Sequence, residues 1–530
     1  MHAERRIVVF TGDPMYSVRR GIVDIDDSRP GLQWLVVWHS PRKSWRRLLR
    51  NQWANLNRNG WRWIPYQLAN ARRVLPQATG VVQQPGPGSE YTLDALRGRP
   101  NLQWLQVGDL HAAATLAAIR QFAPHLGLSL AAPILRLDLF ALPELGTLNL
   151  HKGQLPAFRG MPPAFWEFWT GQTQVGCTVH WVDDKLDTGR IVAETTVRRA
   201  AHASVRSLQL QLDEVGAALM CDAVNKVLTG QASAREQPPH DGKTHRKPTL
   251  TQIAELRNRL APPPPPWPAQ CRHAAKELRA TAAIGLVRSV AYNKLLAPRV
   301  TVLLYHRVSD DARDNLTVGV AQFEQHMALL RRHCRVLSIE QVMSMSKVPR
   351  SDVPLVAVTF DDGYLDNFVH AVPTLRRHAL PAAFFVSTGI VASNNQFPHD
   401  LRRGNAPIAV MNWNQLRDMK RWGFTIGSHT VSHIDCASAD AASVRWELAQ
   451  SRDDLKRELG VEQPIFAYPY GGRQHMTAER LQWIRDAGYV GCLSAYGGSN
   501  IGYVDPYNVV RRGIHWEFSD RALRYACLGL

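Results

Sequence analysis

The chain has 530 residues, of which 45% are hydrophobic and 20% are charged, and its formal net charge is +18. The length favours two to four domains, and the composition excludes a wholly disordered or fibrous protein. No apolar stretch approaches the roughly 18 residues that a membrane span needs, and the apolar run at residues 7–10 is too short for a signal peptide.

The positive charge is concentrated in two segments. Ten basic residues and no acidic one lie between Asp27 and Glu90, and six basic residues meet only Glu277 in residues 267–300. In residues 42–63 the basic residues are interleaved with tryptophans. This mixture suits a solvated amphipathic helix first, a nucleotide sugar, lipid phosphate or anionic membrane surface next, and nucleic acid last.

Seven cysteines are scattered along the chain and are odd in number. This usage suits reduced thiols better than a disulfide framework or a cysteine zinc site. We therefore expect a cytoplasmic chain, and the basic segments leave open a peripheral contact with the inner face of a membrane.

In the first 230 residues, apolar runs of strand length alternate with stretches of helical periodicity. Two helices are predicted, at residues 109–122 and 204–228. The predicted strands are residues 7–11, 32–38, 102–107, 145–150, 175–182 and 190–197. This alternation predicts an α/β domain built on an open, mostly parallel sheet with helices on both faces.

A polar constellation accompanies the strand at residues 145–150. Asn149 and His151 are two positions apart, so they project to the same side of an extended backbone, and Asp187 lies in a tight turn between two strands. An amide that polarises a carbonyl, an imidazole that handles a proton and a carboxylate that tunes the imidazole suit acyl transfer. An ordinary strand turn with a capping aspartate is the alternative interpretation.

The spacing of these residues resembles that of the formyltransferases that use 10-formyltetrahydrofolate, typified by the methionyl-tRNA and glycinamide-ribonucleotide enzymes. The resemblance covers roughly residues 7–228 and is strongest over 146–192. It implies a Rossmann-like fold, Asn149, His151 and Asp187 as the catalytic trio, and attack of a substrate amine on the formyl carbon. An amino sugar or nucleotide sugar is the favoured acceptor, because other members of the family formylate amino sugars.

A proline run at residues 262–266 marks the clearest domain boundary, because it favours polyproline II and excludes a helix or a central strand. We expect a first domain at residues 1–230, a connecting region at 231–297 and a second domain at 298–530. The connecting region comprises a tail, the proline-rich linker and a basic helix at residues 271–296.

Short apolar strands, most of them followed by helix-like segments, recur after this boundary. They are predicted at residues 300–305, 355–360, 382–386, 425–426 and 465–468. This order predicts a second α/β domain, a distorted barrel in which residues at strand ends carry the chemistry.

Two motifs at predicted strand ends indicate a metal site. Asp361 and Asp362 follow the strand at residues 355–360, and the turn there can bring both carboxylates to one cleft. His429 and His433 are four positions apart, so both can reach one ion. One carboxylate and two imidazoles leave coordination positions open for water and substrate. Taken singly, each motif is also compatible with a solvated surface turn.

These motifs resemble those of polysaccharide deacetylases of the NodB type, carbohydrate esterase family 4. The matching strings are Thr-Phe-Asp-Asp-Gly at 359–363, Ser-His-Thr-Val-Ser-His at 428–433 and Tyr-Pro-Tyr-Gly at 468–471. The resemblance extends from about residue 300 to the end of the sequence and implies a distorted (β/α) barrel.

The resemblance also implies a role for each residue of these strings. Asp361 would be the general base, and Asp362, His429 and His433 would bind a divalent metal, usually zinc. A water activated at this site would hydrolyse an N-acyl group, while the backbone N–H of Tyr470 stabilises the oxyanion. The products would be a free amine and a short carboxylic acid.

The chain departs from the family pattern in its third and later motifs. Ala467 stands where many relatives have an arginine that orients the base, and Arg511 or Arg512 is expected to replace it. Arg511 is also assigned, with Tyr470, to substrate binding. His515 is the counterpart of the family's general acid.

The two resemblances together predict a bifunctional enzyme that removes an N-acyl group from an amino sugar and transfers a formyl group to an amine. Surface polysaccharide or glycolipid synthesis is the expected setting, and the hydrolase could remove a formyl group instead. Two alternatives of other classes stay open. One is a monofunctional enzyme or a surface-binding scaffold with one degenerate domain, and the other is a formyltransferase of tRNA or of the purine pathway.

Overall fold

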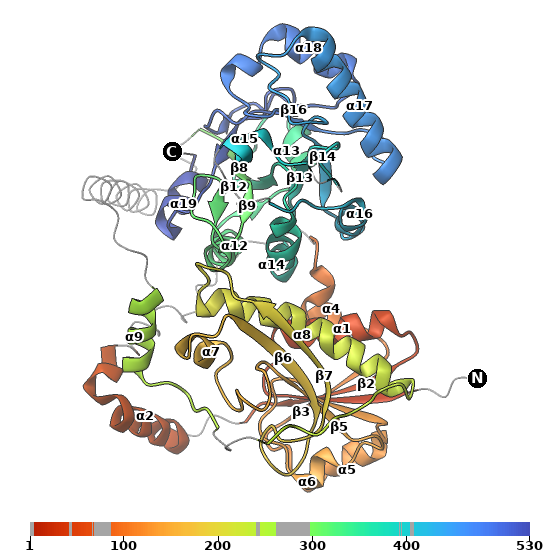
Figure 1. Cartoon of the computed structure of the whole chain (residues 1–530), viewed down its shortest axis with the longest axis vertical. Helices are drawn as coiled ribbons and strands as arrows, with labels where there is room; N and C mark the ends of the chain where they lie inside the picture. Colours follow the sequence, from red (N-terminus) through yellow and green to blue (C-terminus); the bar gives the residue numbers. More distant parts are fainter. Residues whose placement is uncertain are drawn as a thin grey trace. The chain divides into compact units, whose positions relative to one another are not determined.

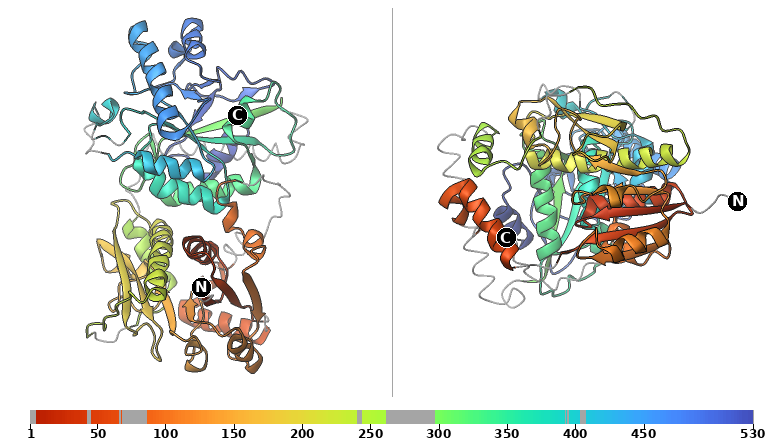
Figure 2. Two further views of the ribbon diagram at one scale, coloured as in Figure 1. Left: turned by 90° about the vertical axis from the view of Figure 1, so that its right-hand side faces the viewer. Right: turned by 90° about the horizontal axis from the view of Figure 1, so that it is seen from below.

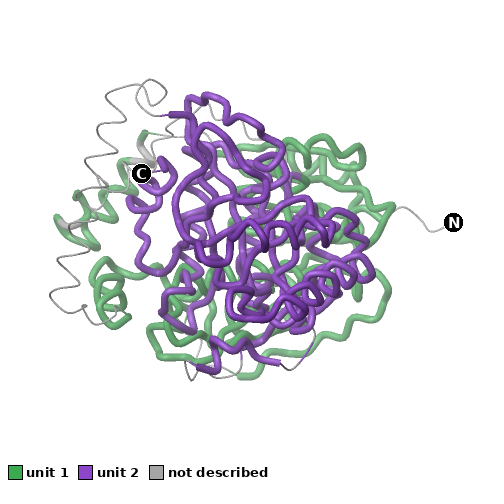
Figure 3. The backbone as a smooth tube through the Cα atoms, turned by 90° about the horizontal axis from the view of Figure 1, so that it is seen from above, with its two compact units in different colours: residues 1–77, 90–262 green, residues 78–89, 263–530 purple. Residues whose placement is uncertain are grey.

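The computed structural model describes residues 5–41, 45–65, 67, 86–239, 244–260, 297–391, 393, 395–402 and 408–529. Figure 1 and Figure 2 follow the chain along its sequence, and Figure 3 distinguishes two compact units. Unit 1 comprises Met1–Gln77 and Glu90–Pro262, and unit 2 comprises Ala78–Ser89 and Pro263–Leu530. The basic helix predicted at 271–296 lies outside the described residues.

Unit 1 is built on a seven-stranded sheet in the order β3-β2-β1-β4-β5-β6-β7. The first five strands in this order are parallel, and β6 and β7 run antiparallel to their neighbours. The predicted open, mostly parallel sheet is thus confirmed. Its strands are β1 (Arg6–Thr11), β2 (Gln33–His39), β3 (Leu102–Val107), β4 (Leu126–Ser129), β5 (Thr147–His151), β6 (Gln174–Trp181) and β7 (Ile191–Arg198).

Helices cover both faces of this sheet (Figure 1), because successive strand residues point to opposite sides. Ile7 and Val9 of β1 pack in one core with helices α1 and α8, and Val8 and Phe10 pack in another with α5 and α6. The helices of unit 1 are α1 (Tyr16–Ser28), α2 (Trp45–Asn59), α4 (Leu93–Arg97), α5 (Ala113–Phe122), α6 (Leu137–Phe140), α7 (Phe165–Trp169), α8 (Val205–Leu228) and α9 (Leu250–Leu260).

The stretch after Gly230, which the sequence predicts as a tail, packs against unit 1. Arg235 forms a backbone bridge with Ile191 at the start of β7, and His245 forms one with Gly160. Helix α9 follows, and the backbone N–H of Leu250 at its start donates to a side chain at the end of α2. The ordered contacts of unit 1 therefore continue well beyond the helix α8.

Unit 2 is built on a mostly parallel sheet in the order β16-β15-β14-β13-β12-β8-β17, in which β18 also pairs with β8 and β11 with β12. Only β17 among these described strands pairs antiparallel. The strands of this sheet are β8 (Arg299–Tyr305), β11 (Arg335–Val336), β12 (Leu355–Phe360), β13 (Ala383–Val386), β14 (Thr425–Ser428), β15 (Phe466–Ala467), β16 (Cys492–Leu493), β17 (Asn500–Ile501) and β18 (Arg511–Gly513). The predicted second α/β domain, with helices between its strands, is confirmed.

Parallel strands end at one edge of a sheet, so the residues that follow β12, β14, β15 and β18 gather there. A separate pair of short strands is β9 (Arg307–Val308) with β10 (Thr317–Val318). The helices of unit 2 are α12 (Val320–His333), α13 (Ile339–Met343), α14 (Val372–His378), α15 (Pro398–Arg402), α16 (Trp413–Arg421), α17 (Ala441–Leu459), α18 (Ala478–Asp486) and α19 (Asp520–Cys527). Across the described parts of the chain, no helix is both long and apolar enough to cross a bilayer.

Candidate active sites

The first candidate site lies where β12 ends in unit 2. All six residues of β12 are buried, and the chain then turns sharply, with φ of 76° at Asp362 and 87° at Gly363. The turn sends the two neighbouring carboxylates in different directions, so Asp361 faces Arg511 and Asp362 faces His429 and His433. A positive φ at a non-glycine residue is strained and concentrates at functional sites.

Asp362, His429 and His433 form a buried cluster with the chemistry of a divalent-metal site. Their candidate ligand atoms all lie within 4.8 Å of one another. Asp362 Oδ1 is 3.5 Å from Nε2 of His429 and 3.3 Å from Nε2 of His433. Among the described residues, neither oxygen of the Asp362 carboxylate finds a hydrogen-bond donor. A buried carboxylate without donors is costly unless a cation compensates it, so these residues fit a metal ion.

The surroundings orient the ring of His429 and fix the turn that leads from it to His433. Nδ1 of His429 lies 2.7 Å from the carbonyl oxygen of Ala467, so Nδ1 carries the proton and Nε2 keeps its lone pair for a metal. The carboxylate of Glu447 on α17 accepts the backbone N–H groups of Val431 and Ser432, at 2.6 and 2.9 Å. Glu447 thereby fixes the turn between the histidines, a role that no local motif in the sequence indicates.

Asp361 pairs with Arg511 of β18 in a fork of two hydrogen bonds, 2.6 and 2.7 Å long. Arg511 is fully buried, and its Nε donates to the carbonyl oxygen of Ser494. Burial alone would raise the pKa of Asp361, but the charge and hydrogen bonds of Arg511 lower it below its ordinary value. Of the two arginines considered from the sequence, Arg511 is thus the one that lies against Asp361.

Tyr470 and His515 lie at the same edge of the sheet. Tyr470 has φ of 61°, and its ring centroid is 5.0 Å from that of His433. Gly513 of β18 lies opposite Leu304 of β8, which lies opposite Thr359 of β12. His515 and Asp361 each lie two residues beyond this common level, so both stand at the carboxyl end of the sheet.

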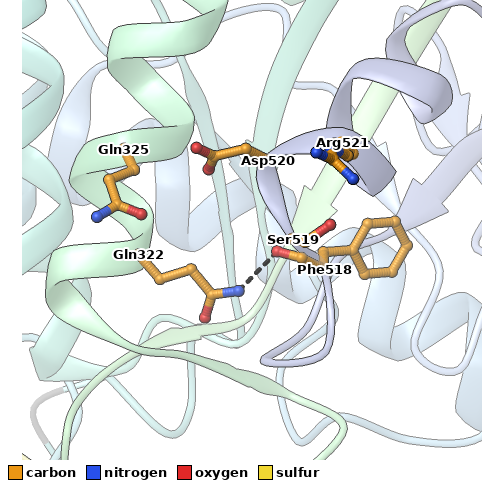
Figure 4. Close-up of a pocket in the computed structure, with 6 residues that line it drawn as sticks. All are labelled: Gln322, Gln325, Phe518, Ser519, Asp520 and Arg521. Carbon is orange, nitrogen blue, oxygen red and sulfur yellow. Dashed lines mark hydrogen bonds between the residues drawn. The ribbon is translucent and has the colours of Figure 1, made fainter. Parts of the chain in front are cut away.

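The loop after His515 is tied to α12. Gln322 donates to the carbonyl oxygens of Trp516 and Phe518, and Nε2 of His326 lies 3.0 Å from the latter oxygen. Figure 4 shows the hydrogen bond from Gln322 to Phe518. Both residues line a pocket beside α12 and the start of α19, with a volume of about 370 Å³. None of the residues that line this cavity belongs to the metal cluster, and we interpret the contacts as support for the His515 loop.

Two further histidines lie near the cluster of Asp362, His429 and His433, and neither is predicted from the sequence to bind the metal. Nε2 of His399 is 3.8 Å from Asp362 Oδ2 and 2.9 Å from the hydroxyl of Tyr364. His306, at the end of β8, has a pKa lowered by burial and interacts electrostatically with Asp362. The sequence places His306 in a Tyr-His-Arg string and predicts a structural or groove-lining role for it, whereas only the position of His399 in the fold brings it to the cluster.

The second candidate site lies in unit 1, where β5 and β6 pair antiparallel with Asn149 opposite His180. Nδ2 of Asn149 lies 3.0 Å from Nε2 of His180, and Nδ1 of His180 lies 2.8 Å from the carbonyl oxygen of Trp181. The carbonyl accepts, so Nδ1 of His180 carries the proton and Nε2 accepts from Asn149. Burial lowers the pKa of His180, which favours this neutral form. His180 orients Asn149, and no motif in the sequence indicates this role.

His151 lies between a backbone carbonyl and Asp187. Its Nε2 is 2.7 Å from the carbonyl oxygen of Phe158, and its Nδ1 is 3.5 Å from Asp187 Oδ2. Since Nε2 donates its hydrogen to this carbonyl oxygen, Nδ1 carries the lone pair and is the atom left to accept a proton. The same oxygen of Asp187 accepts the backbone N–H of Gly160 at 3.1 Å. The structure thus brings together the three residues that the sequence singles out in this half.

The turn that presents Asp187 is held by a residue from the stretch after α8. The side-chain amide of Gln237 donates to the carbonyl oxygens of Asp187 and Gly189, both at 2.9 Å. A Cβ at Gly189 would fall 1.8 Å from the carbonyl oxygen of Trp181, so only glycine fits there. Asp187 itself has φ of 55°. This carboxylate therefore sits in a constrained turn, as is common for functional residues.

Comparison with known proteins separates the same two parts of the chain. Residues 99–224 match the formyl transferase family, and residues 349–491 match the polysaccharide deacetylase family. The chain therefore joins a formyl transferase segment to a polysaccharide deacetylase segment, which confirms the predicted fusion.

Individual relatives match either one part or the other. Methionyl-tRNA formyltransferase of Flavobacterium psychrophilum is 25% identical over 213 residues, which cover 37% of this chain and 67% of the relative. The enzyme of the same name from Roseiflexus is 32% identical over 188 residues, covering 33% and 55%. The structure of the Streptococcus pyogenes deacetylase PplD in complex with acetate is 24% identical, covers 43% of this chain and 97% of its own, and has a TM-score of 0.36. The chain thus spans about half to two thirds of the length of these curated relatives.

Proposed function

We propose that the chain is a bifunctional enzyme that modifies amino sugars. Residues 298–530 would form a metal-dependent N-deacetylase, and residues 1–230 would form a formyltransferase that uses 10-formyltetrahydrofolate. The observation that carries most weight is the buried Asp362, His429 and His433 cluster beside the Asp361–Arg511 pair. Such a set would combine a metal site with a carboxylate kept ionised, and this combination suits the hydrolysis of an amide by an activated water.

In the deacetylase, the residues divide the chemistry among them. Asp362, His429 and His433 would hold a divalent ion, with zinc favoured by two imidazole donors and one carboxylate, and the ion would supply Lewis acidity and lower the pKa of a bound water. Asp361 accepts a proton from the attacking water. The backbone N–H of Tyr470 donates to the carbonyl oxygen as it becomes negative, and His515 donates a proton to the departing amine.

The buried Arg511 has a positioning role in this proposal in place of the substrate contact assigned from the sequence. Its fork fixes both oxygens of Asp361 and keeps this carboxylate charged at neutral pH. Because the guanidinium is fully buried, Arg511 would act on the substrate through Asp361 and not by direct contact.

In the formyltransferase, the amine nitrogen of the acceptor attacks the formyl carbon and the bond from that carbon to the folate nitrogen breaks. Asn149 donates to the formyl oxygen, Nδ1 of His151 takes the proton of the attacking amine, and Asp187 stabilises the resulting imidazolium. The imidazolium then gives this proton to the folate nitrogen as it leaves, so that the folate departs as a neutral amine. His180 holds the Asn149 amide in the orientation that this requires.

The two activities meet at one functional group, the amine on a sugar. The deacetylase exposes an amine, and the formyltransferase consumes one, so N-acyl exchange on one amino sugar is the simplest joint reaction. An amino sugar on a nucleotide or lipid carrier, in surface polysaccharide or glycolipid synthesis, is the proposed substrate, and nucleic acid is the least favoured partner. The scattered, odd-numbered cysteines of the sequence suit reduced thiols, and a cytoplasmic location is part of the proposal.

The test is to incubate the full chain with zinc, 10-formyltetrahydrofolate and N-acetylated amino sugars carried on a nucleotide, with product masses recorded over time. We expect the free amine first and the formamide second. Asp361→Asn should yield neither product from the acetylated sugar but still formylate a free amino sugar. His151→Ala should accumulate the amine. Unchanged substrate across a broad panel would overturn the proposal, and release of formate from a formylated sugar would show that the hydrolase removes formyl groups.

A further inference from the structure

Helix α2 (Trp45–Asn59) in unit 1 presents large apolar side chains to solvent. Trp45, Leu49 and Trp53 are 78%, 59% and 66% exposed. They are spaced four residues apart, and at about 100° per residue they fall within about 80° of one another on the helix. They therefore form a single apolar stripe, which we call the α2 stripe.

The exposure of this stripe is not a consequence of a detached helix. The indole N–H of Trp63 donates to Gln52 Oε1 at 2.8 Å, and this tryptophan is only 9% exposed. Asn59, the last residue of α2, accepts the backbone N–H of Leu250 at the start of α9 at 2.9 Å. One end of α2 is thus anchored to unit 1, while the α2 stripe remains outside.

The apolar surface continues past the end of the helix. Trp61 and Ile64 are 74% and 54% exposed, although Trp63 between them is buried. Indole rings that bury little surface in the folded chain are costly in water and are favoured at an interface that is apolar on one side and wet on the other. Tryptophan is enriched at membrane interfaces for this reason.

The charge of this part of the sequence indicates the kind of interface. Arg50 lies on α2 and is exposed. Between Asp27 and Glu90 the sequence contains ten basic residues and no acidic residue. Basic residues near an anionic bilayer contribute about 1 kcal/mol each. A nucleic acid would match the charge, but it offers no apolar layer for Leu49 and Ile64. An anionic lipid surface matches both properties.

We propose that α2 is an interfacial helix that docks unit 1 on an anionic phospholipid bilayer, with Trp45, Leu49 and Trp53 entering the boundary between headgroups and acyl chains. Arg50 faces the lipid phosphates at the rim of this insertion. The helix has 15 residues and lies in the plane of the interface instead of crossing the bilayer. This inference goes beyond the two activities and depends on neither of them.

The experiment is co-sedimentation of the full chain with vesicles of phosphatidylcholine alone and of phosphatidylcholine mixed with phosphatidylglycerol. We expect binding to the mixed vesicles, a blue shift of tryptophan fluorescence, and partial release by salt because part of the attraction is electrostatic. The triple variant Trp45→Ser, Leu49→Ser, Trp53→Ser should bind at least about tenfold more weakly, since three apolar side chains no longer insert. Arg50→Glu should weaken binding to the mixed vesicles specifically.

Trp446→Ser is the matched control, because Trp446 is a 57% exposed tryptophan on α17 of unit 2. This variant should bind like the wild type. Thermal unfolding and formylation of a soluble amine should be unchanged in the triple variant, since the stripe lies outside the catalytic trio. Binding that is absent, or that the triple variant leaves intact, would overturn the proposal. Two results in the absence of vesicle binding would also overturn it. One is a wild-type dimer that the triple substitution dissociates, and the other is binding of an oligonucleotide that the triple substitution abolishes.

Discussion

Arg511 and Asp361 lie 150 residues apart in the sequence, and inside unit 2 their side chains form two parallel hydrogen bonds of 2.6 and 2.7 Å. The arginine thus reaches Asp361 from β18, next to β8 in the sheet, whereas Ala467, which the family resemblance places at the expected arginine position, lies in β15. The guanidinium that pairs with Asp361 thus comes from β18 and not from β15. The motif departure therefore does not leave Asp361 without a cation.

Substitution of Arg511 should impair catalysis more than metal binding. Arg511→Lys keeps a charge but loses the fork, so we expect a fall in kcat of about 100-fold, with metal content unchanged. Arg511→Met should also destabilise unit 2 by about 3–5 kcal/mol, because it leaves Asp361 buried and unpaired. Deacetylation rates, metal content and thermal unfolding check this. Arg512→Lys, one position along β18, is the control, and equal effects of the two lysine variants would contradict the positioning role.

Loss of either histidine of the metal cluster should remove the bound ion. His429→Ala and His433→Ala each leave a site with two protein ligands, so we expect the purified variants to lack the stoichiometric divalent ion. Elemental analysis after dialysis measures it. Treatment of the wild type with a chelator should lower its melting temperature, because bound metal stabilises the folded state. His378→Gln, a histidine paired with Glu324 away from the cluster, should keep the ion; retention by the cluster variants would refute the site.

His180 should influence formyl transfer without affecting the deacetylase. His180→Ala frees the Asn149 amide, so we expect kcat for formylation to fall by about 10–100-fold, as for partners that orient a reacting group. The deacetylation rate of the same protein serves as an internal reference. His111→Gln, which removes a histidine paired with Asp138, should leave formylation unaltered. A change confined to KM for the folate would argue against an orienting role.

Glu324 should make the stability of unit 2 sensitive to acid. Burial alone would raise its pKa, but hydrogen bonds and charges from His378 and Arg377 lower the pKa to about 2. The folded value lies below the ordinary value of about 4.3, so the stabilisation is present above pH 4.3 and is lost as pH falls through about 2. Glu324→Gln should cost roughly 2–3 kcal/mol at pH 7.

The measurement for Glu324 is thermal or denaturant unfolding over a pH series, compared between wild type and variant. The difference should shrink as pH falls below about 4.3, because the wild type then loses the same interaction. Glu462→Gln provides the control, since that carboxylate is 68% exposed and its pair with Lys456 is expected to contribute within about 1 kcal/mol. A difference that stays constant across the series would contradict the assignment.

Much of the fold follows from local patterns in the sequence. The strands β1, β2, β3 and β12 are long apolar runs, and the structure places them where the sequence predicts them. By contrast, β4 has four residues, one of them a glycine, and local periodicity does not reveal it although it joins β1 to β5 in the sheet. Short central strands owe their stability to neighbours on both sides, which a local pattern does not contain.

The sequence alone revealed the candidate acid–base and metal-binding side chains at strand ends, because neighbouring residues such as Asp361 and Asp362 form a motif that can be recognised without the fold. Only the tertiary structure decided which distant groups complete them: Arg511 for Asp361, and His180 for Asn149 across an antiparallel register. The net charge of +18 follows from the sequence alone, but only the folded unit shows that the apolar α2 stripe is exposed to solvent beside part of this charge. The physical reason is that register and burial depend on pairing between segments far apart in the chain.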